Sequence, residues 1–281
     1  MIQQSTLDKQ KKGKPITDSP AAIWLRDRLH PFMMLLTRTK VTYRVETVNT
    51  YTPVEGKPII FAANHSAFQD APVSLRATKR RSYIFVGKQP LPFMDWVFFV
   101  TTGTLWVDRK IKEDMAATKD AMIEYLAKGQ SILWYPEGTW NLTANKLMLP
   151  MKWGIIDIAQ KANAQIIPMA LDYDRAAKGC KVKFGVPMTD DALENKSEAI
   201  QNLRDTMATL RWDFMSDQTV LHRADITPEQ LETEMCQVLA EYPALDWAFE
   251  QACIYQPYET VKTVPESLSP RRENAFLLRK R

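Results

Sequence analysis

The chain is poor in residues that build metal and redox sites, and it has no long apolar run. It contains three cysteines, three histidines and no Cys-x-x-Cys pair, so we expect neither a metal centre nor a disulfide framework. The few, widely spaced cysteines suit a reducing cytoplasm. No stretch approaches the roughly 20 apolar residues that span a bilayer, and the polar first twenty residues lack the apolar core of a signal peptide. If the protein meets a membrane, we expect contact from one side only.

Charge is unevenly distributed along the chain. The net charge is only +4, but basic residues gather at both ends. The basic positions are Lys9, Lys11, Lys12 and Lys14 near the start, and Arg271, Arg272, Arg279, Lys280 and Arg281 at the end. Such clusters favour an anionic membrane surface as partner, and solvated, mobile tails are an equally good interpretation. We expect no nucleic acid partner, because no recognised binding motif accompanies the charge.

Strand-like and helical segments alternate from residue 57 onward. The predicted strands are 57–64, 82–87, 104–108, 131–135, 164–173 and 180–185, and the predicted helices lie near 71–79, 112–128, 151–162 and 190–211. With 45% hydrophobic residues, the chain has enough material for one large packed domain with extensions. The alternation predicts an α/β fold with a mixed, largely parallel sheet flanked by helices. In such folds, sites gather at the carboxyl ends of the strands.

Segments with other patterns flank this domain. In residues 20–48, apolar side chains at helical spacing predict amphipathic helices, which Pro31 divides into a pair. This pair is a candidate membrane dock, and the alternative is that it packs on the domain core. The other predicted divisions are a disordered N-terminus at 1–19, the main domain at 49–211, a helical appendage at 212–256 and a polar basic tail at 257–281.

His65 and Asp70 form the most informative pattern, a histidine and a carboxylate that follow the apolar run 59–63. A neutral imidazole can take a proton from a hydroxyl near pH 7, and a nearby carboxylate can fix its tautomer and stabilise the imidazolium. The pattern therefore indicates a general base at a strand end, with a bound alcohol as nucleophile. A capping box explains the spacing of Ser66 and Gln69, but it does not explain His65 with Asp70.

Three further segments lie in or after predicted strands. The strand at 131–135 runs into a Pro-Glu-Gly-Thr loop at 136–139, whose backbone N–H groups and hydroxyl suit an anionic or polar ligand. Arg109 ends the run 103–109 and can hold a phosphate with its planar fork, although such an Asp-Arg pair is more often a surface ion pair. The third segment, 164–171, is a buried strand interrupted by a proline.

Taken in order, these motifs resemble the glycerolipid acyltransferase family typified by 1-acylglycerol-3-phosphate acyltransferases, over about residues 20–210. The resemblance implies that His65 and Asp70 form the catalytic motif. It also implies that further residues line the acceptor site and that an Ile-Pro strand lies beside the acyl pocket. The acceptor-site residues are Arg109, Glu137, Gly138 and Thr139, and the strand residues are Ile167 and Pro168. Family members bind membranes through an N-terminal helical pair.

Trp140 departs from the family pattern, in which an arginine follows Pro-Glu-Gly-Thr and holds the acceptor phosphate. An indole removes that bidentate grip and adds a stacking or lipid-facing surface. One possibility is that Arg109, Lys88 or Lys146 holds the phosphate instead. The other is that the acceptor is a different lysophospholipid or glycolipid, whose head group stacks on Trp140. Lys88 precedes an aromatic run at 90–100, which is predicted to line an acyl tunnel, to touch the bilayer or to form a buried core helix.

We therefore expect an acyltransferase that moves a fatty acyl chain from a thioester donor, acyl-CoA or acyl carrier protein, to the hydroxyl of lysophosphatidic acid or a related lysophospholipid. His65 would act as general base and Asp70 would orient it. We expect no acyl-enzyme and no cofactor. The expected location is the cytoplasmic face of a membrane, as a peripheral protein in contact with membrane lipids. The rivals are an acyltransferase for a different lysolipid or glycolipid, and a non-catalytic peripheral membrane protein that binds lipid.

Overall fold

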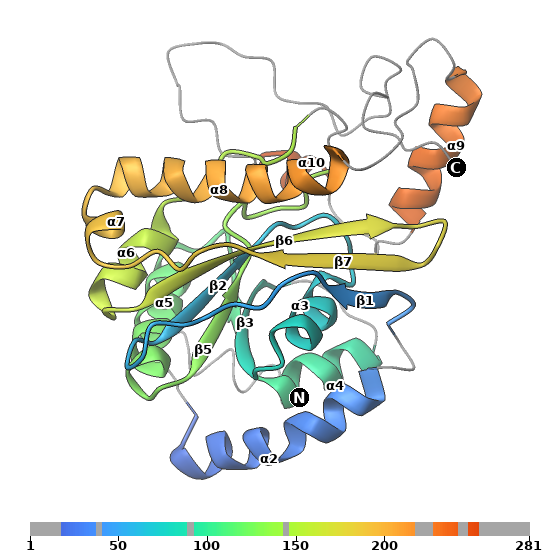
Figure 1. Cartoon of the computed structure of the whole chain (residues 1–281). Helices are drawn as coiled ribbons and strands as arrows, with labels where there is room; N and C mark the ends of the chain where they lie inside the picture. Colours follow the sequence, from blue (N-terminus) through green and yellow to red (C-terminus); the bar gives the residue numbers. More distant parts are fainter. Residues whose placement is uncertain are drawn as a thin grey trace.

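The computed structural model forms a single sheet with helices on both faces (Figure 1). The structure describes residues 18–37, 41–88, 93–142, 146–216, 227–240 and 247–252. The predictions of a disordered N-terminus, of basic clusters at both ends and of a polar tail fall on residues outside these ranges.

The sheet is parallel except at one pair of strands. The strands are β1 (Arg44–Thr47), β2 (Ile59–Ala63), β3 (Ser82–Gly87), β4 (Thr104–Val107), β5 (Ser131–Trp134), β6 (Gln165–Asp174) and β7 (Gly179–Phe184). They are arranged in the order β1-β7-β6-β2-β5-β3-β4, and only β6 and β7 pair antiparallel. The predicted α/β fold with a mixed, largely parallel sheet is thereby confirmed.

Strand β1 was not predicted, and it moves the start of the sheet to a point before residue 49. Its four residues are mostly exposed, so they show no apolar pattern. Parallel pairing with β7, in which Arg44 lies opposite Gly179, supplies the hydrogen bonds that define it. An edge strand of this kind depends on its partner rather than on its own side chains.

Strand β6 continues through the proline that was expected to interrupt it. Its antiparallel pairing with β7 begins at Met169, one residue after Pro168. The missing N–H of Pro168 therefore removes no hydrogen bond from that ladder. The Pro168 carbonyl still accepts a hydrogen bond from the N–H of Gly185 (2.8 Å).

Helices cover both faces of the sheet (Figure 1). They are α2 (Pro20–Thr37), α3 (Asp70–Thr78), α4 (Phe93–Thr102), α5 (Lys112–Ala127), α6 (Gly154–Lys161), α7 (Asp191–Glu194), α8 (Lys196–Ser216), α9 (Pro228–Ala240) and α10 (Trp247–Ala252). The helix predicted near 190–211 is divided into α7 and α8 by the extended backbone of Asn195, and α8 runs on past residue 211.

Two hydrophobic cores lie on the two faces of the sheet. Along β2, Ile60 and Ala62 pack with residues of α5, α6 and α8, whereas Phe61 and Ala63 pack with residues of α3 and α4. Successive side chains of a strand point to opposite faces, and this central strand is buried on both. The chain therefore emerges from β2 between two packed layers, and the segment that contains His65 follows there.

The N-terminal region forms one helix, not the predicted pair. Pro31 lies inside α2, where a proline removes a backbone hydrogen bond and costs roughly 3 kcal/mol. Packing on both sides of the proline offsets that cost, because Ile23 before it and Met33 after it are both buried. The second helix that packs against α2 is α4, which comes from the aromatic run much later in the chain.

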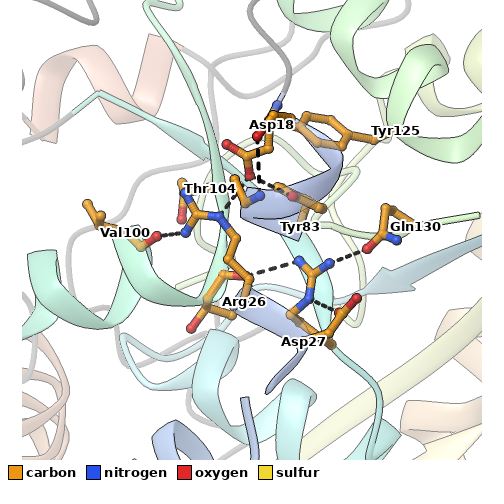
Figure 2. A network of polar contacts seen from close by, with 12 residues as sticks. Asp18, Arg26, Asp27, Tyr83, Val100, Thr104, Tyr125 and Gln130 are labelled. Carbon is orange, nitrogen blue, oxygen red and sulfur yellow. Dashed lines mark hydrogen bonds and ion pairs between the residues drawn. The ribbon is translucent and has the colours of Figure 1, made fainter. Parts of the chain in front are cut away.

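A polar network joins the start of α2 to the body of the domain (Figure 2). The Asp18 carboxylate accepts hydrogen bonds from Arg26 Nε (2.8 Å) and from the Tyr83 hydroxyl (2.7 Å). The Asp18 N–H donates to the Tyr125 hydroxyl (2.7 Å), and Arg26 also donates to the carbonyl of Val100. These bonds tie α2 to β3, α4 and α5 at once.

A second set of bonds fastens the middle of α2. The buried guanidinium of Arg81, just before β3, pairs with Asp27 of α2 and donates to the Gln130 side chain, just before β5. With this face of α2 fixed, the other face is turned outward. The exposed apolar side chains of α2 are Trp24, Leu25, Leu29, Phe32 and Leu35. No helix in the described part of the chain is long and apolar enough to cross a bilayer.

Gly103, between α4 and β4, lies where the backbone passes close to the Tyr83 ring. Its φ is +101°, and a β-carbon there would lie 2.8 Å from the Tyr83 ring. Gly56 has a φ of +76° with no atom within 4 Å of the same position, so it is a control for the backbone cost alone. We expect Gly103→Ala to lower the free energy of unfolding by about 1–3 kcal/mol more than Gly56→Ala does, because overpacking adds to the backbone strain. Urea unfolding measures both, and equal losses would contradict this expectation.

Candidate active site

Asp70 holds His65 in place at the carboxyl end of β2. The His65 Nδ1 atom lies 2.8 Å from Asp70 Oδ2. The same oxygen accepts hydrogen bonds from the backbone N–H groups of Ser66 (2.7 Å) and Ala67 (2.9 Å). The other oxygen, Oδ1, accepts the hydroxyl of Tyr173 on β6 (2.6 Å). The Asp70 side chain is fully buried, so these donors replace the water that it gives up.

This set of donors determines the tautomer of His65. Both Asp70 oxygens act as acceptors, so the bond between Asp70 Oδ2 and His65 Nδ1 needs a proton on Nδ1. Nε2 is then the unprotonated nitrogen, with its lone pair available. The His65 side chain is 19% exposed. The pair can therefore accept a proton from a group that approaches Nε2.

Three aromatic residues keep this arrangement rigid. The Tyr135 ring stacks on the His65 ring at 4.3 Å between centroids, and the Trp140 ring lies at 4.7 Å. Burial, and then the charge of Asp70, raise the pKa of the Tyr173 hydroxyl well above its usual value. Tyr173 therefore stays protonated and remains a donor to Asp70 near neutral pH. Trp140, in the position where the family usually has arginine, contacts the imidazole itself.

Ser66 and Gln69 do not form the capping box that their spacing allows. Helix α3 begins at Asp70 and has no side-chain cap. The side chain of Gln69 instead accepts a hydrogen bond from the N–H of Thr42 (3.0 Å), before β1. The Asp70 side chain instead bonds the turn that precedes the helix, because it accepts from the N–H groups of Ser66 and Ala67.

Glu137 supports the loop after β5 from inside. The resemblance implied that Glu137 lines the acceptor site, but its carboxylate is fully buried. One oxygen accepts the N–H of His65 (3.0 Å) and the other accepts the N–H of Leu149 (2.7 Å). Burial raises the pKa of Glu137 to about 7, against the opposing effect of those two hydrogen bonds. Glu137 therefore positions the backbone of His65.

Arg109 and Thr139 meet at a carboxylate that the sequence did not indicate. Arg109 Nη1 donates to the Gly138 carbonyl (3.0 Å) and to Glu250 Oε2 (3.1 Å), and Nη2 pairs with Glu250 Oε1. The Thr139 hydroxyl donates to Glu250 Oε2 (2.7 Å). Glu250 belongs to the short helix α10, more than 100 residues further along the chain. The structure thus brings together three of the four residues expected at the acceptor site and adds a fourth partner.

Two lysines complete the charge distribution near these loops. Lys88 Nζ pairs with the buried Asp114 (3.0 Å), which also accepts the N–H of Asp108 (2.6 Å). Lys152 was not foreseen by sequence reasoning. Its ammonium lies 3.0 Å from the position that a β-carbon would take on Gly138, whose φ of +75° favours glycine. Both strongest cation candidates, Arg109 and Lys88, are therefore already paired with carboxylates.

Sequence reasoning missed Tyr173, Lys152 and Glu250. Tyr173 lay in a predicted strand with no polar signal beyond its hydroxyl. Glu250 lay in an appendage to which no function was assigned. No local pattern marks any of the three, because each reaches the site through pairing or packing of distant segments.

The described residues include no group of three or more histidine, cysteine or acidic side chains that could hold a metal ion. Cys180 is buried near Asp70 and Asp172, and burial, then these charges, raise the pKa of its thiol. Cys236 is exposed on α9, and Cys253 lies outside the described residues.

Comparison with known proteins finds an acyltransferase domain in this chain. The family model described as Acyltransferase matches residues 41–172. A 1-acyl-sn-glycerol-3-phosphate acyltransferase of Saccharomyces cerevisiae is 28% identical over 54% of this chain and 54% of its own length. A 1-acyl-sn-glycerol-3-phosphate acyltransferase of Chlamydomonas reinhardtii is 28% identical over 42% of this chain and 35% of its own length. The chain thus spans about half or less of these relatives.

A solved structure shares the fold. The crystal structure of the 1-acyl-sn-glycerophosphate (LPA) acyltransferase, PlsC, from Thermotoga maritima matches with a TM-score of 0.56 at 14% identity. The match covers 69% of this chain and 83% of that chain, and at such low identity it shows the fold alone. Fold and family model together define an acyltransferase domain. The chain thus carries an acyltransferase domain and is similar to glycerolipid acyltransferases of the 1-acyl-sn-glycerol-3-phosphate acyltransferase type, in keeping with the motif set.

The pKa of Glu137 leads to a pH-dependent stability. Because this pKa rises from 4.5 to about 7 on folding, the folded protein keeps a proton between these pH values that the unfolded chain releases. The free energy of unfolding therefore falls as the pH rises from about 4.5 to 7, by up to about 3 kcal/mol from this group. Glu137→Gln has no titrating group at this position, so its free energy of unfolding lacks this pH dependence. Urea unfolding at pH 5 and pH 8 should show wild type losing stability relative to the variant, and a constant difference would refute the shifted pKa.

Proposed function

We propose that this protein transfers a fatty acyl chain from a thioester donor to the hydroxyl of lysophosphatidic acid or a related lysophospholipid. The donor is acyl-CoA or acyl carrier protein. The observation that supports this most directly is the bond between Asp70 Oδ2 and His65 Nδ1, which leaves Nε2 as a base. The family and the names of the relatives support the reaction class.

The proposed step is a direct attack on the thioester. His65 Nε2 takes the proton of the acceptor hydroxyl, and the acceptor oxygen forms a bond to the thioester carbonyl carbon. The carbon–sulfur bond then breaks, and the imidazolium returns its proton to the leaving thiolate, so a free thiol and a new ester remain. The buried Asp70 stabilises the imidazolium while it exists. No protein nucleophile is needed, because the acceptor hydroxyl itself attacks the thioester.

The acceptor head group is the open element of the proposal. Arg109 and Thr139 offer donors for a phosphate, which favours lysophosphatidic acid. Trp140 takes the usual place of an arginine and packs on His65, which favours an acceptor with a different head group, a lysophospholipid or glycolipid. A panel of lysolipid acceptors, with the products identified by mass spectrometry, separates these two possibilities.

His65→Ala tests the proposed base. We expect acyl transfer from labelled acyl-CoA to fall by about 10²–10⁴-fold, the usual contribution of a general base, while the circular dichroism spectrum is retained. Ser66→Ala serves as the control, because the neighbouring hydroxyl has no chemical role in this mechanism. Comparable loss in both variants, or a trapped acyl-protein, would contradict the direct transfer. Unaltered lipid binding with no transfer by wild type would favour the rival, a non-catalytic lipid-binding protein.

We infer that the outward face of α2, together with the start of α4, docks the protein on a membrane from its cytoplasmic side. Besides the apolar side chains of α2, Phe93 and Met94 at the start of α4 are exposed, with Phe93 72% accessible. Further along the same helix, Phe98 and Phe99 are buried. The aromatic run thus has exposed side chains at the start of α4 and buried side chains further along the helix. Large exposed apolar side chains on two packed helices are typical of an interfacial surface.

Two tryptophans with nearly equal exposure test this surface. Trp24 on α2 is 59% exposed, and Trp212 on α8 is 57% exposed. Trp24→Glu should reduce co-flotation with anionic phospholipid vesicles several-fold, because it places a charge in the proposed interface. Trp212→Glu should leave flotation unchanged. If the two variants float equally, the α2 and α4 surface is not the dock.

A further inference from the structure

Glu250 fills the position where Arg109 and Thr139 converge. Both of its carboxylate oxygens are used, Oε1 by Arg109 and Oε2 by Arg109 (3.1 Å) and the Thr139 hydroxyl (2.7 Å). The residue is only 3% exposed. A buried carboxylate loses its contacts with water, and here the donors of Arg109 and Thr139 take the place of that water. The contact is therefore a specific one between α10 and the proposed acceptor site.

The same donors suit the phosphate of an acceptor lipid. A phosphate and a carboxylate both present paired oxygens that a guanidinium fork binds in parallel, and both accept a hydroxyl. We propose that Glu250 occupies the position of the acceptor's phosphate and determines acceptor affinity. An acceptor phosphate replaces the Glu250 carboxylate on Arg109 and Thr139 when it binds. The identity of this ligand rests on the proposed function.

The position of the loop supports this assignment. Thr139 lies between Glu137, which accepts the backbone N–H of His65, and Trp140, whose ring lies 4.7 Å from the His65 ring. A group bound to the Thr139 hydroxyl is thus bound by a loop that contacts the backbone of His65 on one side of Thr139 and its ring on the other. Arg109 is itself held, because its Nε lies 2.8 Å from the position of a β-carbon on Gly87 and Nη1 is bonded to the Gly138 carbonyl. Neither of these two contacts of Arg109 involves Glu250.

Exchange of the two anions gives Glu250 a role in specificity. A doubly charged phosphate competes with a single carboxylate for Arg109, with the nearby ammonium of Lys152 adding to the attraction at this loop. An acceptor without a phosphate has no group to replace the carboxylate. Glu250 therefore weakens the binding of phosphate-bearing acceptors, which must displace its carboxylate, and has little effect on an acceptor without a phosphate.

Glu250→Gln tests the proposal, with Glu232→Gln as its control. Glu232 is an exposed glutamate on α9, so its replacement removes the same charge from the C-terminal part of the chain. Calorimetric titration with glycerol 3-phosphate, which is the head group without its acyl chain, should show about tenfold tighter binding in Glu250→Gln than in wild type. Glu232→Gln should bind like wild type. Equal affinity in all three proteins would overturn the proposal.

Inorganic phosphate is the second probe in the same titration. Weaker binding of inorganic phosphate than of glycerol 3-phosphate supports an acceptor head group as the natural occupant. Equal or tighter binding of inorganic phosphate would overturn that assignment. In activity assays, Glu250→Gln should lower the KM for lysophosphatidic acid at least fivefold more than the KM for monoacylglycerol, which lacks the phosphate. Equal changes for the two acceptors would contradict a role in phosphate competition.

A measurement on the unaltered protein covers the case in which Glu250→Gln misfolds. Hydrogen exchange of residues 247–252 in wild type should quicken when glycerol 3-phosphate is added, because displaced Glu250 no longer holds α10. Unchanged or slower exchange at saturating ligand would overturn the proposal. The proposed function fails separately: glycerol 3-phosphate that binds and releases α10 in a protein without acyl transfer would preserve this inference and reject the enzyme.

Discussion

The site depends on a carboxylate with no access to water. Burial of the Asp70 charge costs several kcal/mol unless each oxygen finds donors. Two backbone N–H groups, the Tyr173 hydroxyl and the His65 ring supply them. The first two belong to the turn after β2, and Tyr173 belongs to β6, the neighbouring strand. The turn after β2, the pairing of β2 with β6 and the orientation of the imidazole therefore all depend on this one buried charge.

Carboxylates also control the positive charges around the site. Arg109 is paired with Glu250, and Lys88 is paired with Asp114. Cations that are neutralised in this way keep their side chains in one geometry, but they attract a distant anion less than free cations would. Under the proposed function, an anionic acceptor would therefore be recognised at short range, by exchange of partners. This requirement, together with Trp140 at the imidazole, makes the proposed acceptor site different from one built on unpaired arginines.

Several features followed from sequence alone because their causes are local. The apolar run of β2 and the five-residue separation of His65 from Asp70 placed a histidine and a carboxylate at a strand end. Strand β1, the single helix α2 and the uninterrupted β6 were not predicted. In each case the local pattern was weak or adverse, and pairing or packing with a distant segment outweighed it.

The amino-acid sequence by itself determined the fold class, the resemblance to acyltransferases and the identity of the paired histidine and carboxylate. Periodicity and ordered motifs act over a few residues at a time, so a single chain displays them. Only the tertiary structure decided which nitrogen of His65 is free, that Glu137 faces inward, and that Glu250 meets Arg109 and Thr139. These contacts join residues about 70 to more than 100 positions apart in two of the three cases. Such contacts exist only once the sheet has brought the carboxyl ends of its strands together.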